Sequence, residues 1–195
     1  KQTRATKAKE KGLEPLANIL LLHATSKSME EEAQSFVDEA KGVTNAKEAL
    51  AGAKDIIAEA VSDEADYRTR IRDLTMKKGH VTSTAKDPEA ESVYEMYYEF
   101  DEPVNKLAGH RILALNLNVK VEAPEEDILR FLERKVITRD NPNTTPVLKE
   151  VVADAYDRLI APAIEREIRS SLTEMAEDGA IRVFGKNLEQ LLMQP

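Results

Sequence analysis

The spacing of apolar residues predicts a chain built mostly of amphipathic helices. Several runs place apolar side chains three and four residues apart, the period of one helix face. Ser28 with Glu31, and Asn45 with Glu48, have the spacing of capping boxes that open helices. Helices are therefore expected over residues 3–11, 13–22, 28–41, 45–61, 62–78, 92–100 and 125–136.

A short stretch in the middle of the chain has the period of a strand instead. Leu117, Val119 and Val121 alternate with polar residues, as on a strand with one buried face. Residues His80–Thr84 also read as a short extended piece. The sequence predicts a small sheet in which Val81–Thr84 lies beside Leu117–Val121.

The last third of the chain, Asn141–Met193, predicts a long helical segment. It opens with a turn and N-cap signal at Asn141–Pro146, and Pro162 is the one proline on the way. Its first apolar stripe is Ile164, Ile168, Leu172 and Met175, and its second is Ala180, Phe184, Leu188 and Leu191. At about 100° per residue the stripes lie roughly 160° apart, so the helix needs two partners or a break at Asp178–Gly179.

These patterns together predict a mostly α fold, a multi-helical domain with a small β element and a long C-terminal helix. Residues 1–140 are expected to form the helical region with the β element. Residues 141–195 are expected to form a helical spine, whose second stripe meets a following domain or drives self-association.

Composition narrows the class of protein. Of 195 residues 42% are hydrophobic, which is enough for a real core. No run approaches the length of a membrane span, and the chain has no cysteine for disulfides or thiolate metal sites. The net charge of -8 argues against an extended nucleic-acid surface but leaves a local basic patch open. The start at Lys1 and the end in an amphipathic run indicate an internal fragment.

Several blocks, in this order along the chain, carry a resemblance to a known family. They are Lys11–Ala17 (KGLEPLA), Glu48–Ala53 (EALAGA), Asp55–Glu59 (DIIAE), Gly109–Leu115 (GHRILAL), Asp154–Pro162 (DAYDRLIAP), Glu165–Arg169 (EREIR) and Gln190–Leu192 (QLL). Together they resemble the N-terminal region of the Tex family of bacterial transcription accessory proteins. The resemblance covers essentially the whole chain. One departure is that Asn116 joins Leu117 directly, where similar proteins carry a short charged loop that is either deleted here or left out of this sequence.

The resemblance implies a cytoplasmic bacterial protein that continues after Pro195. The family has an RNase H-like domain, helix-hairpin-helix modules and a C-terminal OB-fold that binds RNA. The implied partners are RNA or DNA through the full-length protein, the downstream RNase H-like and OB-fold domains of the same chain, and RNA polymerase. The family is also distantly related to a eukaryotic transcription elongation factor.

The sequence offers little that could carry catalysis. It has no glycine-rich phosphate loop, and His23, His80 and His110 lack a carboxylate at metal-ligand spacing. We therefore expect no enzyme activity, no catalytic residue, no metal ligand and no cofactor. Tyr94, Tyr97, Tyr98 and Phe100 could stack bases, but interleaved acidic residues favour a packing role.

The candidate nucleic-acid contacts are basic residues in three places. They are Arg4, Lys7 and Lys11 on the first helix, Lys77 and Lys78 at a helix end, and His110 with Arg111. The plainer alternative is ordinary solvated side chains, and for His110 a helix cap or structural histidine. Two functions remain: a non-catalytic scaffold and interaction region of a nucleic-acid-binding transcription factor, or a stand-alone helix-turn-helix-like DNA- or RNA-binding module.

Overall fold

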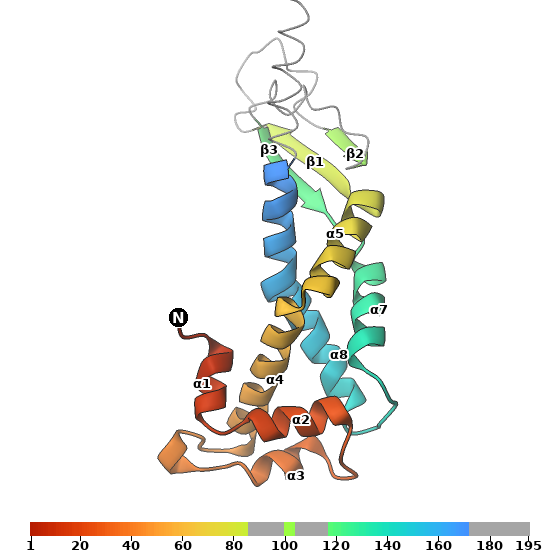
Figure 1. Ribbon diagram of the computed structural model, residues 1–195. Helices are drawn as coiled ribbons and strands as arrows, with labels where there is room; N and C mark the ends of the chain where they lie inside the picture. The colour runs from red at the N-terminus through yellow and green to blue at the C-terminus, as the bar shows by residue number, and fades with distance from the viewer. Residues whose placement is uncertain (86–99, 104–116, 172–195) are drawn as a thin grey trace, which may run out of the picture. The chain divides into compact units, whose positions relative to one another are not determined.

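The computed structural model describes residues 1–85, 100–103 and 117–171 (Figure 1). The chain forms two compact units, each made of two segments. Unit 1 is Lys1–Thr69 with Glu125–Pro162, and unit 2 is Arg70–Pro124 with Ala163–Pro195. Both units draw on residues from either side of position 140, and the division into residues 1–140 and 141–195 stays a prediction.

Unit 1 is arranged around α4 (Ala46–Asp63), against which several other helices pack. These are α1 (Arg4–Glu10), α2 (Glu14–Leu22), α3 (Met29–Gln34), α8 (Thr145–Asp154) and the π-helical η4 (Ala155–Ile160). Small residues, among them Ala49, Ala53 and Ala58, are fully buried on α4. Small side chains at a contact shorten the distance between helix axes, which lets neighbours pack closely around α4.

The turn between α1 and α2 lies directly against α4. A side chain at Gly52 would overlap the Cδ1 atom of Leu13 and stand 3.2 Å from the Cβ of Ala8. Leu13 itself is 1% exposed. Gly52 is therefore the residue that lets this turn sit on α4.

The helix starts confirm part of the predicted capping. The side chains of Ser28 and Asn45 accept hydrogen bonds from the amides of Glu31 and Glu48. The Glu48 carboxylate, however, accepts from the amide of Thr44 at 3.0 Å rather than from Asn45. The serine and asparagine caps are thus correct, and the reciprocal half of the box at Glu48 is displaced by one residue.

The helix predicted over residues 28–41 is wrong beyond Gln34, where α3 ends. A bridge pairs Asp38 with Val43, around the short 3-10 helix η1 (Glu39–Lys41). The Asp38 side chain accepts from the amide of Ala40 at 3.0 Å, and such local bonds compete with helix. The helix predicted to start at Ser62 is also displaced, because α4 continues to Asp63 and the Ser62 hydroxyl donates to Glu59.

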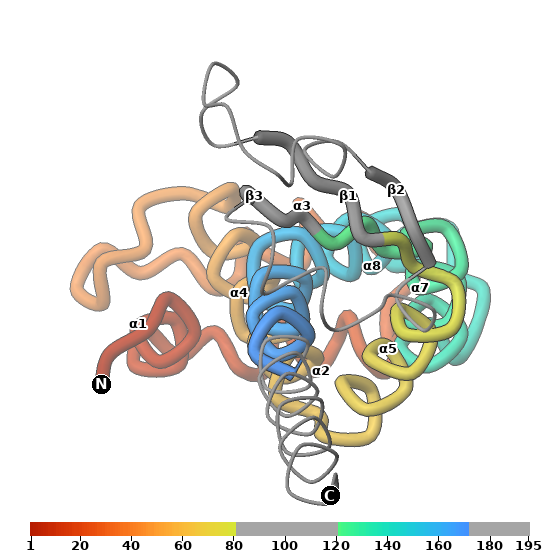
Figure 2. The backbone as a smooth tube through the Cα atoms, turned by 90° about the horizontal axis from the view of Figure 1, so that it is seen from above, coloured from red at the N-terminus to blue at the C-terminus, as the bar shows by residue number. Residues whose placement is uncertain are grey.

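Two further helices end where the prediction places them. α5 (Ala65–Lys78) begins in unit 1 and continues in unit 2. α7 (Glu125–Val136) has the predicted bounds and packs on α8, beside which it lies in Figure 2. Within unit 1 the Tyr67 and Phe131 rings meet edge to face, with centroids 6.0 Å apart, the geometry that aromatic pairs favour.

Unit 2 holds a three-stranded antiparallel sheet in the order β2-β1-β3. The strands are β1 (His80–Ala85), β2 (Phe100–Pro103) and β3 (Leu117–Glu122). Val81 lies opposite Val121 and Thr84 opposite Asn118, so the predicted pairing is confirmed. Phe100 opens β2 instead of ending a helix, and the rest of the helix predicted over 92–100 lies outside the described residues.

The long segment near the C-terminus is helical as far as the structure describes it. α8 and η4 are followed by helical backbone over residues 161–171, so Pro162 does not end the helix. Ile164 and Ile168 are buried, with 3% and 1% of their surface exposed, as their stripe predicts. Leu172, Met175 and the second stripe lie outside the described residues. The predicted class, mostly helical with a small β element and a long helix near the C-terminus, is confirmed.

Candidate functional site

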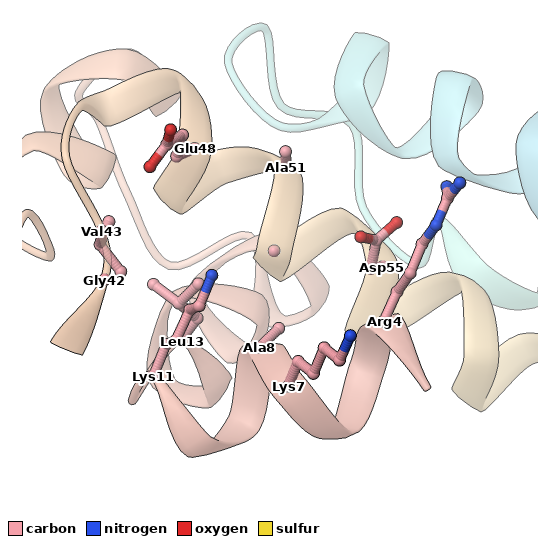
Figure 3. A pocket seen from close by; sticks show the side chains of 11 residues that line it. Arg4, Lys7, Ala8, Lys11, Leu13, Gly42, Val43, Glu48, Ala51 and Asp55 are labelled. Carbon is pink, nitrogen blue, oxygen red and sulfur yellow. The ribbon is translucent and has the colours of Figure 1, made fainter. Parts of the chain in front are cut away.

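The first candidate site is the basic face of α1. Arg4, Lys7 and Lys11 recur three and four residues apart on the exposed side of the helix, while Ala5 and Ala8 are buried on the other side. The three basic residues line one pocket of about 340 Å³ within unit 1 (Figure 3). We call this pocket the α1 groove. It brings together three of the residues that the sequence singles out.

The rest of the α1 groove is largely apolar. Its lining includes the buried residues Ala8, Leu13 and Val43, the exposed Gly42 before α4, and two small residues of α4, Ala51 and Gly52. Val43 is 1% exposed and lies where the Asp38–Val43 bridge holds the backbone. The floor is therefore part of the core of unit 1 and is fixed by its packing.

A fourth cation, Lys41, lies near the α1 groove, because two turns that contain glycines with positive φ bring it there. Gly12 and Gly42 have φ of 75° and 84°, a region that glycine enters without steric cost. A Cβ at Gly12 would stand 3.3 Å from Lys41 Nζ, and one at Gly42 would stand 3.6 Å from Lys11 Cε. The Lys41 side chain thus lies against Gly12, and the Lys11 side chain lies against Gly42. Lys41 was not among the residues expected from the sequence, because its place depends on these two turns.

Two carboxylates also line the α1 groove, and each has a partner of its own. The amide of Thr44 donates to Glu48, which lowers the pKa of Glu48, with a smaller effect from Lys11. Burial raises the pKa of Asp55, although Arg158 and Arg4 oppose this effect. Arg158 Nη2 lies 3.6 Å from Asp55 Oδ1 and 3.1 Å from Asp154 Oδ2.

The remaining candidates fall elsewhere. Lys77 and Lys78 are exposed at the end of α5, in unit 2. His110, Arg111 and the predicted interaction-helix residues Ala180, Phe184, Leu188 and Leu191 lie outside the described residues. Of the candidate nucleic-acid contacts among the described residues, the structure therefore brings only Arg4, Lys7 and Lys11 together in one place.

A second basic pocket lies in unit 2 and was not anticipated. Arg72 of α5 and Arg166 line a pocket of about 410 Å³ together with Ala163, Glu167, Ser170 and Ser171. The sequence carried a signal for it, since α5 contains Arg68, Arg70 and Arg72 at alternate positions. Arg68 and Arg72 share one helix face and Arg70 does not, and only Arg72 lines the pocket, so its pairing with Arg166 could not be read from the spacing.

His23 is a structural residue in this fold. It ends α2 in the left-handed conformation, is 5% exposed, and its Nδ1 lies 2.6 Å from the Thr144 hydroxyl. The Asn141 side-chain amide donates to the carbonyls of His23 and Thr25. Among the described residues no three His, Asp or Glu side chains are grouped to hold a metal. In the same part of the chain no helix is long and apolar enough to cross a membrane.

The described residues define a mostly helical protein with a small antiparallel sheet and a basic groove on its first helix. The chain belongs to the Tex central region-like family, whose model matches residues 24–184. The family resemblance carried by the sequence blocks is thereby confirmed.

Individual relatives agree with this family. The whole chain aligns with the uncharacterized protein YdcI of Bacillus subtilis at 43% identity, and the aligned region is 28% of that protein. With the protein tex of Bordetella pertussis, 99% of the chain aligns at 31% identity, and the aligned region is 27% of that protein. With the human S1 RNA-binding domain-containing protein 1, 99% of the chain aligns at 27% identity, and the aligned region is 21% of that protein. The chain thus spans about a quarter of the length of these relatives.

Proposed function

We propose that this chain is a non-catalytic scaffold and interaction region of a Tex-like, nucleic-acid-binding transcription accessory protein. One relative is named transcriptional accessory protein Tex, in Neisseria gonorrhoeae, and another is named for an S1 RNA-binding domain. The chain matches 27% and 21% of their lengths. On this proposal RNA or DNA is bound through the full-length protein, outside this region. The downstream RNase H-like and OB-fold domains of the same chain are partners of this region, and RNA polymerase is a further partner in the bacterial cytoplasm.

The main support for the scaffold role is that polar side chains of unit 1 form hydrogen bonds and ion pairs with one another. His23 bonds Thr144, the Thr3 hydroxyl donates to Glu59 at 2.7 Å, and Arg158 bridges Asp55 and Asp154. The contacts His23–Thr144, Thr3–Glu59 and Arg158–Asp55 each join segments that are distant in sequence, whereas Asp154 lies four residues before Arg158. Polar residues that could otherwise serve chemistry thus fix helices to one another, which favours a structural role without catalysis.

The alternative, a stand-alone helix-turn-helix-like module, is disfavoured by charge. At the start of unit 1, α1 and α2 are joined by Lys11–Leu13, and α2 and α3 by residues 23–28. The recognition helix of a helix-turn-helix is the second of its pair, which would be α2 or α3 here. Neither contains a lysine or an arginine, and α3 carries Glu30, Glu31 and Glu32 in its first turn. A recognition helix lies among phosphates, where three carboxylates would be repelled.

A chimera tests the proposal. This chain would replace the matching region of the tex protein of Bordetella pertussis, with and without charge substitutions at Lys7, Lys11, Lys77 and Lys78. We expect RNA affinity at physiological salt to change by less than about twofold, because lost phosphate contacts would otherwise weaken binding steeply. A loss of tenfold or more, roughly the effect of one or two phosphate contacts, would assign RNA binding to this region and contradict the proposal.

A further inference from the structure

We propose that the α1 groove binds an acidic peptide segment of a partner protein. Carboxylates of the peptide meet Arg4, Lys7 and Lys11, and an apolar side chain of the peptide packs on the exposed Ala51 of the floor. The inference deepens the proposed function, on which it rests, by naming the site and the chemical class of the partner.

The first support is the charge of the rim. No ion pair joins Arg4, Lys7 or Lys11 to another side chain within the described part of the chain. The two carboxylates of the lining have stronger partners, Glu48 in the Thr44 amide and Asp55 in Arg158, and Lys11 and Arg4 act on them only as weaker, secondary charges. Three cations on one helix face, with Lys41 beside Lys11, are therefore available to an anionic ligand.

The second support is the apolar floor, which distinguishes a peptide from a nucleic acid. Ala8, Leu13 and Val43 are buried core residues that also line the groove, and Ala51 beside them is exposed. The lining contains no aromatic ring on which a base could stack. A peptide can place an apolar side chain on such a floor, whereas a sugar-phosphate backbone gains little from it.

The third support is the position of the carboxylates within the lining. Glu48 and Asp55 stand on α4, seven positions apart, opposite the cations of α1 (Figure 3). A nucleic acid carries a charge at every phosphate and would bring some of them close to these carboxylates. A peptide can alternate acidic and neutral residues, and so meet the cations without facing Glu48 or Asp55.

The groove is also formed in advance of binding. Its walls are two turns with positive-φ glycines, the Asp38–Val43 bridge and the close contact of the α1–α2 turn with Gly52. A site whose backbone is already fixed loses less entropy when its ligand binds. This favours specific docking over a loose charge contact.

The test measures fluorescence anisotropy of a fluorescein-labelled peptide of Asp-Leu-Glu repeats, titrated with the 195-residue chain. Three comparison ligands are an Asn-Leu-Gln peptide, an Asp-Ser-Glu peptide and labelled single-stranded RNA. The variants are Lys7→Glu with Lys11→Glu for the rim, and Ala51→Asp for the floor. Lys9→Glu is the matched control, because Lys9 is exposed on the same helix but does not line the groove. Circular dichroism and thermal unfolding confirm that each variant folds.

We expect the Asp-Leu-Glu peptide to bind more tightly than the other three ligands. The double variant and Ala51→Asp should each weaken binding by about tenfold or more, and Lys9→Glu by less than about threefold, since a rim charge outside the contact acts mainly at long range. Equal losses for Lys9→Glu and the double variant would overturn the proposal, as would preferential RNA binding or no peptide binding. The lack of peptide binding would leave the proposed function standing, because the chimera measures RNA binding independently.

Discussion

At the scale of single residues, Asp55 is where burial and charge act in opposite directions. Burial raises the pKa of its carboxyl above the usual 3.8, and Arg158 and Arg4 only partly oppose this. A group whose folded pKa is raised contributes stability that is fully present below the unfolded pKa and is lost as pH rises through the folded pKa. Ionised Asp55 is thus a cost to the fold at neutral pH.

Substitution of Asp55→Asn should therefore change how stability depends on pH. Relative to the variant, the natural chain should be most stable below pH 3.8 and should lose that advantage as the pH rises above it. Urea unfolding of both proteins across this range measures the difference in free energy of unfolding. A natural chain that instead gains relative stability with rising pH would show that Arg158 and Arg4 outweigh burial.

The contact of His23 with Thr144 gives a second prediction. Thr144→Val keeps the shape of the side chain but removes the hydroxyl at 2.6 Å from Nδ1 of the buried histidine. We expect a loss of about 1–3 kcal/mol in unfolding free energy, the cost of leaving a buried polar group unpaired. Thr138→Val, at an exposed position, is the control and should change stability by less than about 0.5 kcal/mol. Equal effects of the two substitutions in urea unfolding would remove the structural role assigned to this pair.

The residues also show what a sequence can and cannot predict. The helical spacing of Arg4, Lys7 and Lys11 is by itself enough to place the three side chains on one face. The pairing of His23 with Thr144 spans 121 positions, and no local pattern encodes it. Lys41 lies near the α1 groove because of the positive-φ turns at Gly12 and Gly42, so its position could not be predicted.

At the scale of elements, the packing of the α1–α2 turn on α4 depends on Gly52. Gly52→Val would place side-chain atoms where Leu13 now lies buried. We expect a loss of about 1–3 kcal/mol, typical of overpacking a core. Ala51→Val is the matched control, since it adds a branched side chain to the same helix at an exposed position and should cost less than about 1 kcal/mol. Thermal unfolding compares them, and similar losses would place the α1–α2 turn outside the core.

Helices and strands were predictable where the apolar residues repeat regularly and residues that end such an element follow. α7 has the predicted bounds because its apolar stripe lies between Pro124 and the polar turn after Val136. The helix expected over 28–41 fails because the Asp38 side chain forms its own turn and Val43 is drawn into the core. β2 was missed because its four residues, Phe100–Pro103, are too few to show a period.

At the scale of the whole molecule, the proposed function leaves nucleic-acid binding to parts of the full-length protein other than this chain. The chain carries a net charge of -8. Its basic residues are spread over many elements, among them α1, α4, α5, α7 and α8, whereas α2 and α3 carry none. Binding to a duplex or a single strand gains much of its free energy from counterions released at clustered cations. An acidic chain with few such clusters should gain little.

The most direct measurement is a titration of labelled single-stranded RNA and duplex DNA with this chain alone at physiological salt. We predict no binding tighter than the weak range of nonspecific complexes, about 10⁻⁴–10⁻⁶ M. The same titration with Lys77→Ala and Lys78→Ala together should give the same result. Submicromolar binding that these two substitutions abolish would show that the chain itself reads nucleic acid, and would contradict the assignment of binding to the rest of the protein.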